Sequence, residues 1–403
     1  MELKTRYQYT YFIYPYIIEN KQYKEYIASL IKNKNCELKV FDKDKDLEIY
    51  SYFLPKLRKY IFPTFDAKIN KSKINASKLA KQTCCIFEYR LKEDIQGKAG
   101  KESSGIFFDI KNIEIICFNT GICFLSIKTN VEDSKEFQNI LNFNYKFRNI
   151  KAKKMARKQF ENIKVQSNNF DDIKKFTDLV DDLTLHSKAA SELNIDIEKF
   201  FTYSYTCLEQ ENWNSNNPFS NIEHEFYKYC NVLPSVYNLN LDKINKNEDI
   251  EIISKWEYIK IGFSKTGTCL LTSAIDTYNY TKLPFNFERK YLYQYIFLLY
   301  KKIYLNKINY DYRNERDSSK LRRKFLNFTQ NIWIYEITNN DIGSLMYKNW
   351  AKVLELDKTY LNIKNEYDLI YKESNLDKTS KINRTILLGL VVLLIINILN
   401  IIF

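Results

Sequence analysis

Residues 385–403 read TILLGLVVLLIINILNIIF, and this stretch decides the class of the protein. No polar or charged side chain occurs from Ile386 to Ile396, and only Asn397 and Asn400 interrupt the remainder. A helix of about eighteen residues is about 27 Å long, which is close to the hydrocarbon thickness of a bilayer. A buried core helix at this place would need protein cover on every side. The stretch therefore predicts a single transmembrane helix.

The charges beside the apolar stretch predict its orientation. Lys378, Lys381 and Arg384 precede it, and no charged residue follows it in the sequence. Because basic residues next to a membrane helix tend to stay in the cytoplasm, we expect the N-terminal part of the chain on the cytoplasmic side. The predicted location is the cell inner membrane, crossed once.

The polar residues of the stretch gather on one side of the predicted helix. An amide inside a bilayer is costly unless it meets another polar group or water. At helical spacing, one face about a third of the circumference wide carries Thr385, Gly389, Leu393, Asn397 and Asn400. Such a face suits a contact between helices or the lining of a pore built by several copies. The alternative is a plain anchor in which Asn400 reaches the far headgroups.

The sequence upstream of the membrane mixes strand and helix signals up to about residue 280. Gly121 supplies the positive φ that a tight turn needs, so Asn112–Thr129 predicts a hairpin. A second hairpin is expected at Trp256–Ser273, and its turn repeats a Thr-Gly-x-Cys pattern of the first hairpin. We further predict strands at 7–16, 84–91, 106–110 and 200–208, a helix at 21–32, a linker at 97–102, and mainly helix over 133–196.

After Pro284 the apolar residues change to helical spacing. Helices are predicted for Glu288–Tyr310 and Ser318–Glu336, and a third begins at the N-cap pair Asn340-Asp341. Neither proline nor a strong glycine break separates Asp341 from the membrane stretch, so we expect one continuous stalk. The predicted fold class is an α/β soluble domain (1–280), a helical layer and stalk (281–384), and one C-terminal transmembrane helix (385–403).

Composition excludes some functions. The chain has 403 residues, of which 45% are hydrophobic, so it is long enough for two or three packed units. Its net charge of +13 favours acidic partners, but abundant Ile, Asn and Tyr indicate AT-rich codons that also raise the Lys content. No nucleic-acid-binding pattern occurs, and no direct nucleic-acid partner is expected. The eight cysteines lie mostly in apolar runs and read as reduced, buried side chains.

No catalytic motif is complete. The chain has only two histidines, and Glu223-His224-Glu225 lacks the second histidine of a zinc-protease motif, since that position is Lys228. The Gly97–Glu102 segment resembles a phosphate loop but has Ile95 and Glu102 where glycine and Ser or Thr are required. We therefore expect no enzyme activity, no catalytic residues, no cofactor and no metal ligands.

Two basic clusters are candidate binding sites for an anionic, nucleotide-like small molecule. They comprise Lys151, Lys153, Lys154, Arg157 and Lys158 after the first hairpin, and Lys320, Arg322, Arg323 and Lys324 in the second predicted helix. From these we select as ligand-binding candidates Lys151, Lys153, Lys154, Arg157, Arg322 and Arg323. The alternative is a solvated helix face, which is what charge runs usually are.

The last 120 residues or so carry a pattern that runs from Tyr291-x-x-x-Tyr295-Ile296-x-x-Leu299 through Trp333-Ile334-Tyr335-Glu336 to Trp350 and the stalk. This pattern resembles the CorA-like divalent-cation channel family. The resemblance implies an N-terminal α/β domain, a helical layer, a stalk and a pore formed by five subunits, with a divalent cation as the only cofactor or cargo that it suggests. The chain departs from the family in lacking its Gly-Met-Asn motif and its second membrane helix. Both departures count against ordinary cation transport, and no selectivity residue is carried over.

Divergent CorA-like proteins that accompany type III CRISPR systems are similar to this chain, and the resemblance implies a nucleotide second messenger in antiviral defence. The first hypothesis is a homo-oligomeric membrane effector, a pentamer by resemblance, whose partners are the lipid bilayer, other copies of itself and an anionic ligand. The alternatives are a monomeric tail-anchored scaffold that recruits partners to the membrane, divalent-cation transport, and a hydrolase too divergent to recognise.

Overall fold

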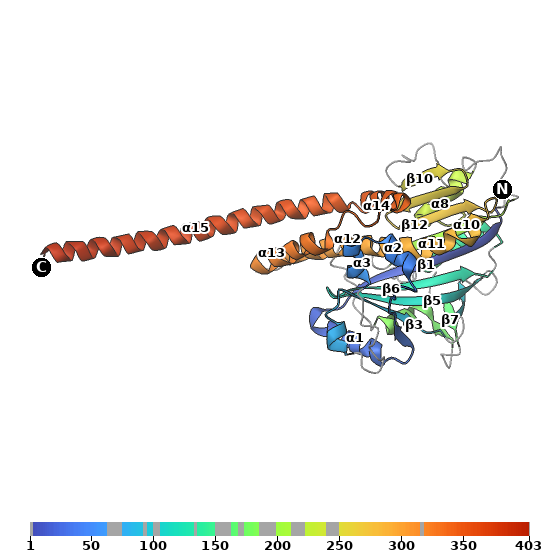
Figure 1. The fold of residues 1–403 in the computed structure, drawn as a ribbon, viewed down its shortest axis with the longest axis horizontal. Helices are drawn as coiled ribbons and strands as arrows, with labels where there is room; N and C mark the ends of the chain where they lie inside the picture. The colour runs from blue at the N-terminus through green and yellow to red at the C-terminus, as the bar shows by residue number, and fades with distance from the viewer. Residues whose placement is uncertain are drawn as a thin grey trace. The chain divides into compact units, whose positions relative to one another are not determined.

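The computed structural model describes residues 3–62, 75–91, 95–99, 105–132, 135–149, 163–167, 173–184, 199–210, 222–238, 250–314 and 318–402 (Figure 1). The chain forms two compact units. The first comprises Met1–Ile303 and Ile334–Leu354, and the second comprises Tyr304–Trp333 and Glu355–Phe403. This grouping differs from the three consecutive parts expected from sequence, because residues 334–354 return to the first unit.

The first unit is built on one mixed sheet of twelve strands within the described residues. The strands are β1 (Thr5–Ile17), β2 (Cys36–Leu38), β3 (Cys84–Tyr89), β4 (Ile95–Ala99), β5 (Ile106–Phe118), β6 (Ile122–Val131), β7 (Lys164–Gln166), β8 (Lys174–Lys175), β9 (Phe201–Leu208), β10 (Ile250–Trp256), β11 (Ile259–Ser264) and β12 (Gly267–Ser273). The order is β10-β11-β12-β9-β1-β6-β5-β4-β7-β8, and β2 pairs with β3, which pairs with β5. The mixed α/β N-terminal region predicted from sequence is confirmed.

Both predicted hairpins are present, but their glycines have different structural roles. Gly121 has φ 82° between β5 and β6, as the turn requires. Gly267 instead starts β12 against β9, where a Cβ would stand 2.4 Å from the Thr202 carbonyl oxygen. β12 runs parallel to β9, whereas β6 runs antiparallel to β1. The repeated Thr-Gly-x-Cys pattern therefore does not mark two equivalent units.

One sequence prediction in this unit is wrong. The linker expected at 97–102 begins inside β4, whose residues pair with both β5 and β7. Gly97 is needed there because a Cβ would lie 2.2 Å from the Phe108 ring. The described residues of the region 133–196, expected to be mainly helical, form α5 (Phe137–Arg148) and α7 (Phe176–Leu183) together with the short strands β7 and β8. The two short strands were not predicted, because they depend on pairing with β4.

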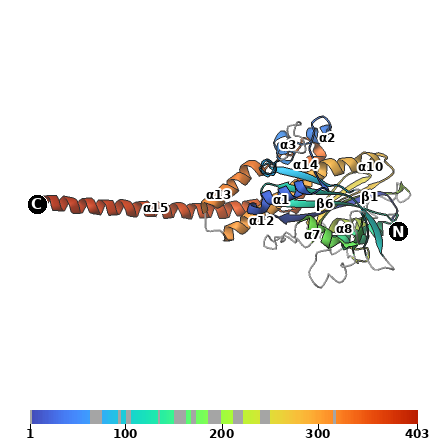
Figure 2. The ribbon, with the colours of Figure 1, turned by 90° about the horizontal axis from the view of Figure 1, so that it is seen from below.

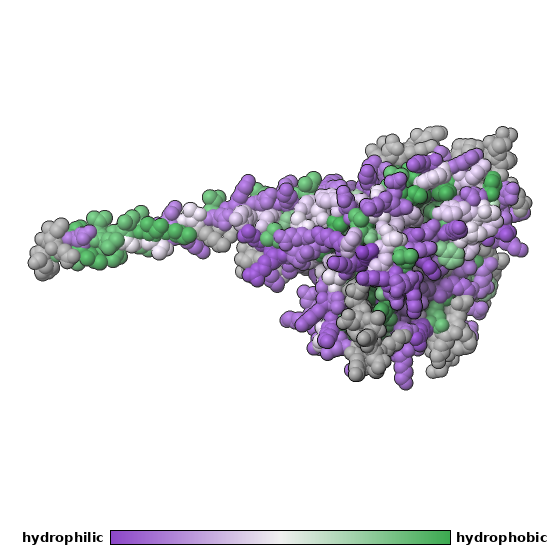
Figure 3. All heavy atoms as spheres, in the orientation of Figure 1, coloured by the Kyte–Doolittle hydropathy of each residue, from purple (hydrophilic) through white to green (hydrophobic). Residues whose placement is uncertain are grey.

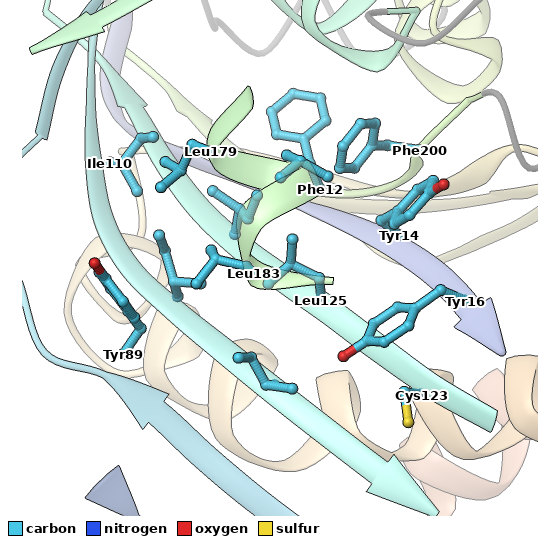
Figure 4. Close-up of a cluster of buried hydrophobic side chains, with 14 of the residues drawn as sticks. Phe12, Tyr14, Tyr16, Tyr89, Ile110, Cys123, Leu125, Leu179, Leu183 and Phe200 are labelled. Carbon is cyan, nitrogen blue, oxygen red and sulfur yellow. The ribbon is translucent and has the colours of Figure 1, made fainter. Parts of the chain in front are cut away.

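Alternation along the central strand β1 divides the core into two layers. Phe12, Tyr14 and Tyr16 face one side, where the first hydrophobic cluster includes residues of α1 (Asn20–Lys32), α5 and α7 (Figure 4). On this side the Phe12 and Phe147 ring centres are 4.2 Å apart. A second cluster joins α8 (Glu223–Asn231) to the sheet through Phe226 and Cys230.

The odd-numbered residues of β1 face a different set of helices. Tyr9 donates a 2.7 Å hydrogen bond to the Pro284 carbonyl, which lies in α11 (Leu283–Asn286). This layer consists of α2 (Leu47–Tyr52), α3 (Pro55–Ile61), α10 (Tyr278–Thr281), α11, the π-helix η6 (Phe287–Tyr291), the first part of α12 (Leu292–Asn314) and α14 (Asp341–Val353). Figure 2 shows α7 and α8 on one side of the sheet and α2, α3 and α10 on the other. A four-residue helix, α4 (Ala76–Leu79), packs near α1.

The C-terminal part of the chain is helical, as predicted, but two helix boundaries differ from expectation. The helix predicted for 318–336 is α13 (Ser318–Asn327) followed by the π-helix η7 (Phe328–Ile332), and it ends four residues early. The stalk predicted to be continuous from Asp341 is two helices, α14 and α15 (Leu356–Ile402). Glu355 separates them with φ 52°, a left-handed conformation that interrupts a right-handed α-helix.

Candidate membrane-spanning helix and candidate binding residues

The C-terminal half of α15 is long and apolar enough to cross a membrane. Thr379–Leu399 has a mean hydropathy of 2.3, and none of this segment is buried within the chain. Leu387 and Leu388, for example, are 65% and 66% exposed. In Figure 3 the same part of the helix is mostly hydrophobic, in contrast to the mixed surface of its first half. The segment is thus one candidate membrane span in the described part of the chain.

The predicted pore-lining residues all lie on α15, and the single chain brings no other described element against them. Thr385 Oγ1 donates a 3.0 Å hydrogen bond to the Lys381 carbonyl, so its hydroxyl is satisfied within the helix. A Cβ at Gly389 would meet no atom within 4 Å, and Leu393 is 59% exposed. Asn397 is exposed and its amide has no hydrogen-bond partner among the described residues, while the Asn400 side chain lies outside them.

The first half of α15 is held by an aromatic cluster in the second unit. Tyr360 stacks on Trp333 with ring centres 4.3 Å apart and an angle of 8° between the planes. Phe325 of α13 packs on Tyr360 at 5.6 Å and on Tyr367 at 5.2 Å. Ile363 is 1% exposed between them. Because rings of this size contribute much buried area, they fix the face that α15 presents to α13.

The basic candidate residues are only partly described. Lys151, Lys153, Lys154 and Arg157 lie outside the described residues. Arg322 and Arg323 are exposed on α13, as a solvated face would be. The Arg322 guanidinium lies 4.7 Å from the centre of the Tyr371 ring, where it stacks on α15 rather than standing free for a ligand. Lys324 is paired with Asp311 at 2.8 Å.

Two partly buried ion pairs that sequence reasoning missed lie between the sheet and the layer containing η6 and α12. Lys39 Nζ is 2.6 Å from Glu114 Oε1, and the Tyr293 hydroxyl donates to the same carboxylate at 3.2 Å. Burial alone would lower the pKa of the Lys39 ammonium, but Tyr293 and Glu114 outweigh it and raise that pKa. The sequence carries a signal for this pair, because Glu114 lies inside the apolar run Ile113–Ile116 and a buried charge requires a partner.

The second pair fixes the π-helix η6 to the sheet. Lys128 Nζ of β6 contacts both carboxylate oxygens of Glu288, at 2.7 and 2.8 Å. The Tyr11 hydroxyl donates to the same carboxylate. Burial raises the pKa of the Tyr11 hydroxyl, and the Glu288 charge raises it further. All the charges in both pairs have partners, so their arrangement favours a structural role.

The cysteines and the other potential metal ligands can be placed where the structure describes them. All eight cysteines are unpaired, and every one except the half-buried Cys36 is buried, as predicted. Burial raises the pKa of the Cys85 thiol to about 12 and that of Cys36 to about 11. Across the described ranges no three His, Cys, Asp or Glu side chains are placed to hold a metal ion. His224 lies on α8, and His186 lies outside the described residues.

No protein-family model matches the sequence, and the search of curated proteins gives no match. The functional argument therefore depends on the residues and the geometry of this chain.

Proposed function

We propose that the chain is a homo-oligomeric, single-pass membrane effector whose α/β unit lies in the cytoplasm and acts on the bilayer through α15. The observation that carries this proposal is the apolar segment Thr379–Leu399, none of which is buried by the rest of the chain. Burying one Leu or Ile side chain is worth about 1.5–3 kcal/mol, so leaving such a segment in water is strongly unfavourable. A bilayer is the environment that such a helix fits.

The orientation follows from the charges next to the segment. Lys381 and Arg384 are exposed on α15 just before the apolar run. The positive-inside rule keeps such residues on the cytoplasmic side, together with the sheet-containing unit that precedes them. A ligand signal would pass from that unit to the membrane through α15, which begins at the Glu355 joint. We also propose that an anionic ligand binds at the exposed Arg323.

Insertion is tested by placing charge in the middle of the segment. Two arginines, Leu390→Arg with Leu394→Arg, add about 6–8 kcal/mol to the free energy of insertion. We expect the wild-type chain to remain in the membrane pellet after alkaline carbonate extraction and the variant to be released. The matched control places both arginines in the exposed polar half of α15, Asn362→Arg with Asn365→Arg, and stays in the pellet. Extraction of the wild-type chain would refute the proposal.

Effector activity is separated from plain anchoring by exchanging the helix. Residues 385–403 are replaced by an unrelated membrane helix of equal length, and growth inhibition on expression is compared with the wild type. Loss of inhibition, with membrane location retained, supports an effector whose helix acts on the bilayer. Full inhibition by the exchanged chain would favour a tail-anchored scaffold. Dye release from vesicles that carry the protein, with added mono- and oligonucleotides, then tests for ligand-dependent opening.

A further inference from the structure

The helix α15 has two opposite apolar faces before it reaches the membrane segment, and the described part of the chain covers only one of them. Tyr360, Ile363 and Tyr367 are the face that packs on α13. At about 100° per residue, Leu376 lies about 180° from Tyr367. Leu369 and Leu376 are 62% and 70% exposed. Large aliphatic side chains aligned on the uncovered face of a helix need a partner to bury them.

The exposed leucines belong to a row that repeats every seven residues and continues into the apolar segment. The row is Leu369, Leu376, Asn383, Leu390 and Asn397. A seven-residue repeat returns to almost the same side of a helix, drifting by about 20° per repeat, and a left-handed supercoil removes the drift. We call this row the seam.

The asparagines of the seam indicate what kind of partner fits it. Asn383 and Asn397 are exposed, and neither amide has a hydrogen-bond partner within the described residues. An amide carries both donors and an acceptor, so it can pair with an identical amide. In a parallel contact between two copies, every residue of a seven-residue row lies next to its own counterpart. A second copy thus supplies Asn397, inside the apolar segment, with the partner that lipid cannot, and it can pair Asn383 in the same way.

We propose that copies of this chain associate in parallel along the seam, with the Asn383 and Asn397 amides hydrogen-bonded between copies. This inference rests on the proposed function, because membrane insertion gives every copy the same direction. It differs from the predicted pore-lining face, with which it shares only Asn397. Thr385 lies about 200° from Asn383 around the helix and so faces away from the seam.

The test is disulfide crosslinking of full-length chains in native membranes. Leu376→Cys and Leu390→Cys place one thiol each on the seam, in a Cys36→Ser background because Cys36 is the one native thiol that is not fully buried. The matched control is Leu388→Cys, which has the same native residue at nearly the same depth but lies about 200° from position 390. Thr385→Cys reports on the predicted pore-lining face. Copper phenanthroline is the oxidant.

We expect covalent dimers from Leu376→Cys and Leu390→Cys, and at least a five-fold lower yield from Leu388→Cys and Thr385→Cys. Equal yields at positions 388 and 390, or a higher yield at 385, would overturn the seam. The mass of the detergent-solubilised wild type separates the two proposals. An oligomer without crosslinks at the seam refutes the seam alone, whereas a monomer refutes both the seam and the homo-oligomeric effector.

Discussion

The first part of α12 and the apolar part of α15 are both rich in large apolar residues, but their polar side chains have opposite environments. In Leu292–Ile303 the side chains of Gln294 and Lys301 are fully buried. Gln294 donates to the Gly343 carbonyl at 2.8 Å, and Lys301 donates to the Ile334 carbonyl. In α15 the Asn397 amide is exposed without such a partner in the described part of the chain.

This difference teaches how to read a polar residue in an apolar helix. Where the chain itself supplies the partner, the helix belongs to a protein core, and the residue stabilises a fixed arrangement of elements. Where it does not, the partner must come from outside the chain. The predictions below test each side of this contrast.

The largest effect is expected inside the core. Lys301 Nζ also lies 3.1 Å from the Tyr347 hydroxyl. Lys301→Ala leaves the Ile334 carbonyl with only the 3.3 Å hydrogen bond from the Tyr347 hydroxyl and opens a cavity, so the free energy of unfolding should fall by about 2–4 kcal/mol. Lys301→Met keeps most of the volume and should cost about half as much. Thermal unfolding of the full chain in detergent, followed by tryptophan fluorescence, measures both.

The control for this prediction is an exposed lysine of the same unit. Lys282→Ala should change the free energy of unfolding by less than about 0.5 kcal/mol. If Lys301→Ala changed the free energy of unfolding as little as Lys282→Ala does, the buried contacts of Lys301 would not stabilise the fold.

An intermediate effect is expected at Asn397, and on association rather than folding. Asn397→Leu removes an inter-copy hydrogen bond worth about 0.6–1.7 kcal/mol, so self-association in detergent should weaken about 3- to 18-fold. The thermal transition of the α/β unit should not move. Asn397→Gln retains the amide and should retain most of the association. Unchanged association of the leucine variant would show that Asn397 finds its partner elsewhere.

The smallest effect is expected at the joint between α14 and α15. Glu355 adopts φ 52°, which costs a residue with a Cβ about 1–2 kcal/mol, whereas glycine adopts it freely. Glu355→Gly should raise the free energy of unfolding by about 0.5 kcal/mol, because the greater backbone entropy of glycine offsets part of the relief. Lys364→Gly, in regular helix, should lower it by about 1 kcal/mol. A loss of stability in both variants would mean that the Glu355 joint carries no strain.

Local patterns predicted the elements whose signals are local. The Tyr-rich apolar run gave β1, Gly121 gave the β5–β6 hairpin, and the composition of residues 385–403 gave the apolar half of α15. The misses depend on distant partners. No glycine or proline marks the left-handed conformation at Glu355 in the sequence. The edge strands β7 and β8 form because β4 pairs with β7. The partners of Glu114 are 75 and 179 residues away along the chain.

The candidate site was predictable to a similar extent. Apolar length alone identifies a membrane segment, and helical spacing places its polar residues on a face. Helical spacing does not predict which face of the stalk is already covered within the chain. That face is set by Phe325 and Phe328, which come from outside α15 and pack on Tyr360. The basic candidates show the same limit, since the stacking of Arg322 on Tyr371 is a tertiary contact.

The unbroken length of α15 has a consequence for how the chain can vary. Its aromatic base and its apolar end lie on one helix of 47 residues, so they share a single rotational phase. One residue inserted between them would turn the end by about 100° relative to the base, whereas seven would return it to within about 20° and move it about 10 Å outward. Length changes in this segment are therefore tolerable in steps of about seven residues, and single insertions or deletions are the ones that selection should remove.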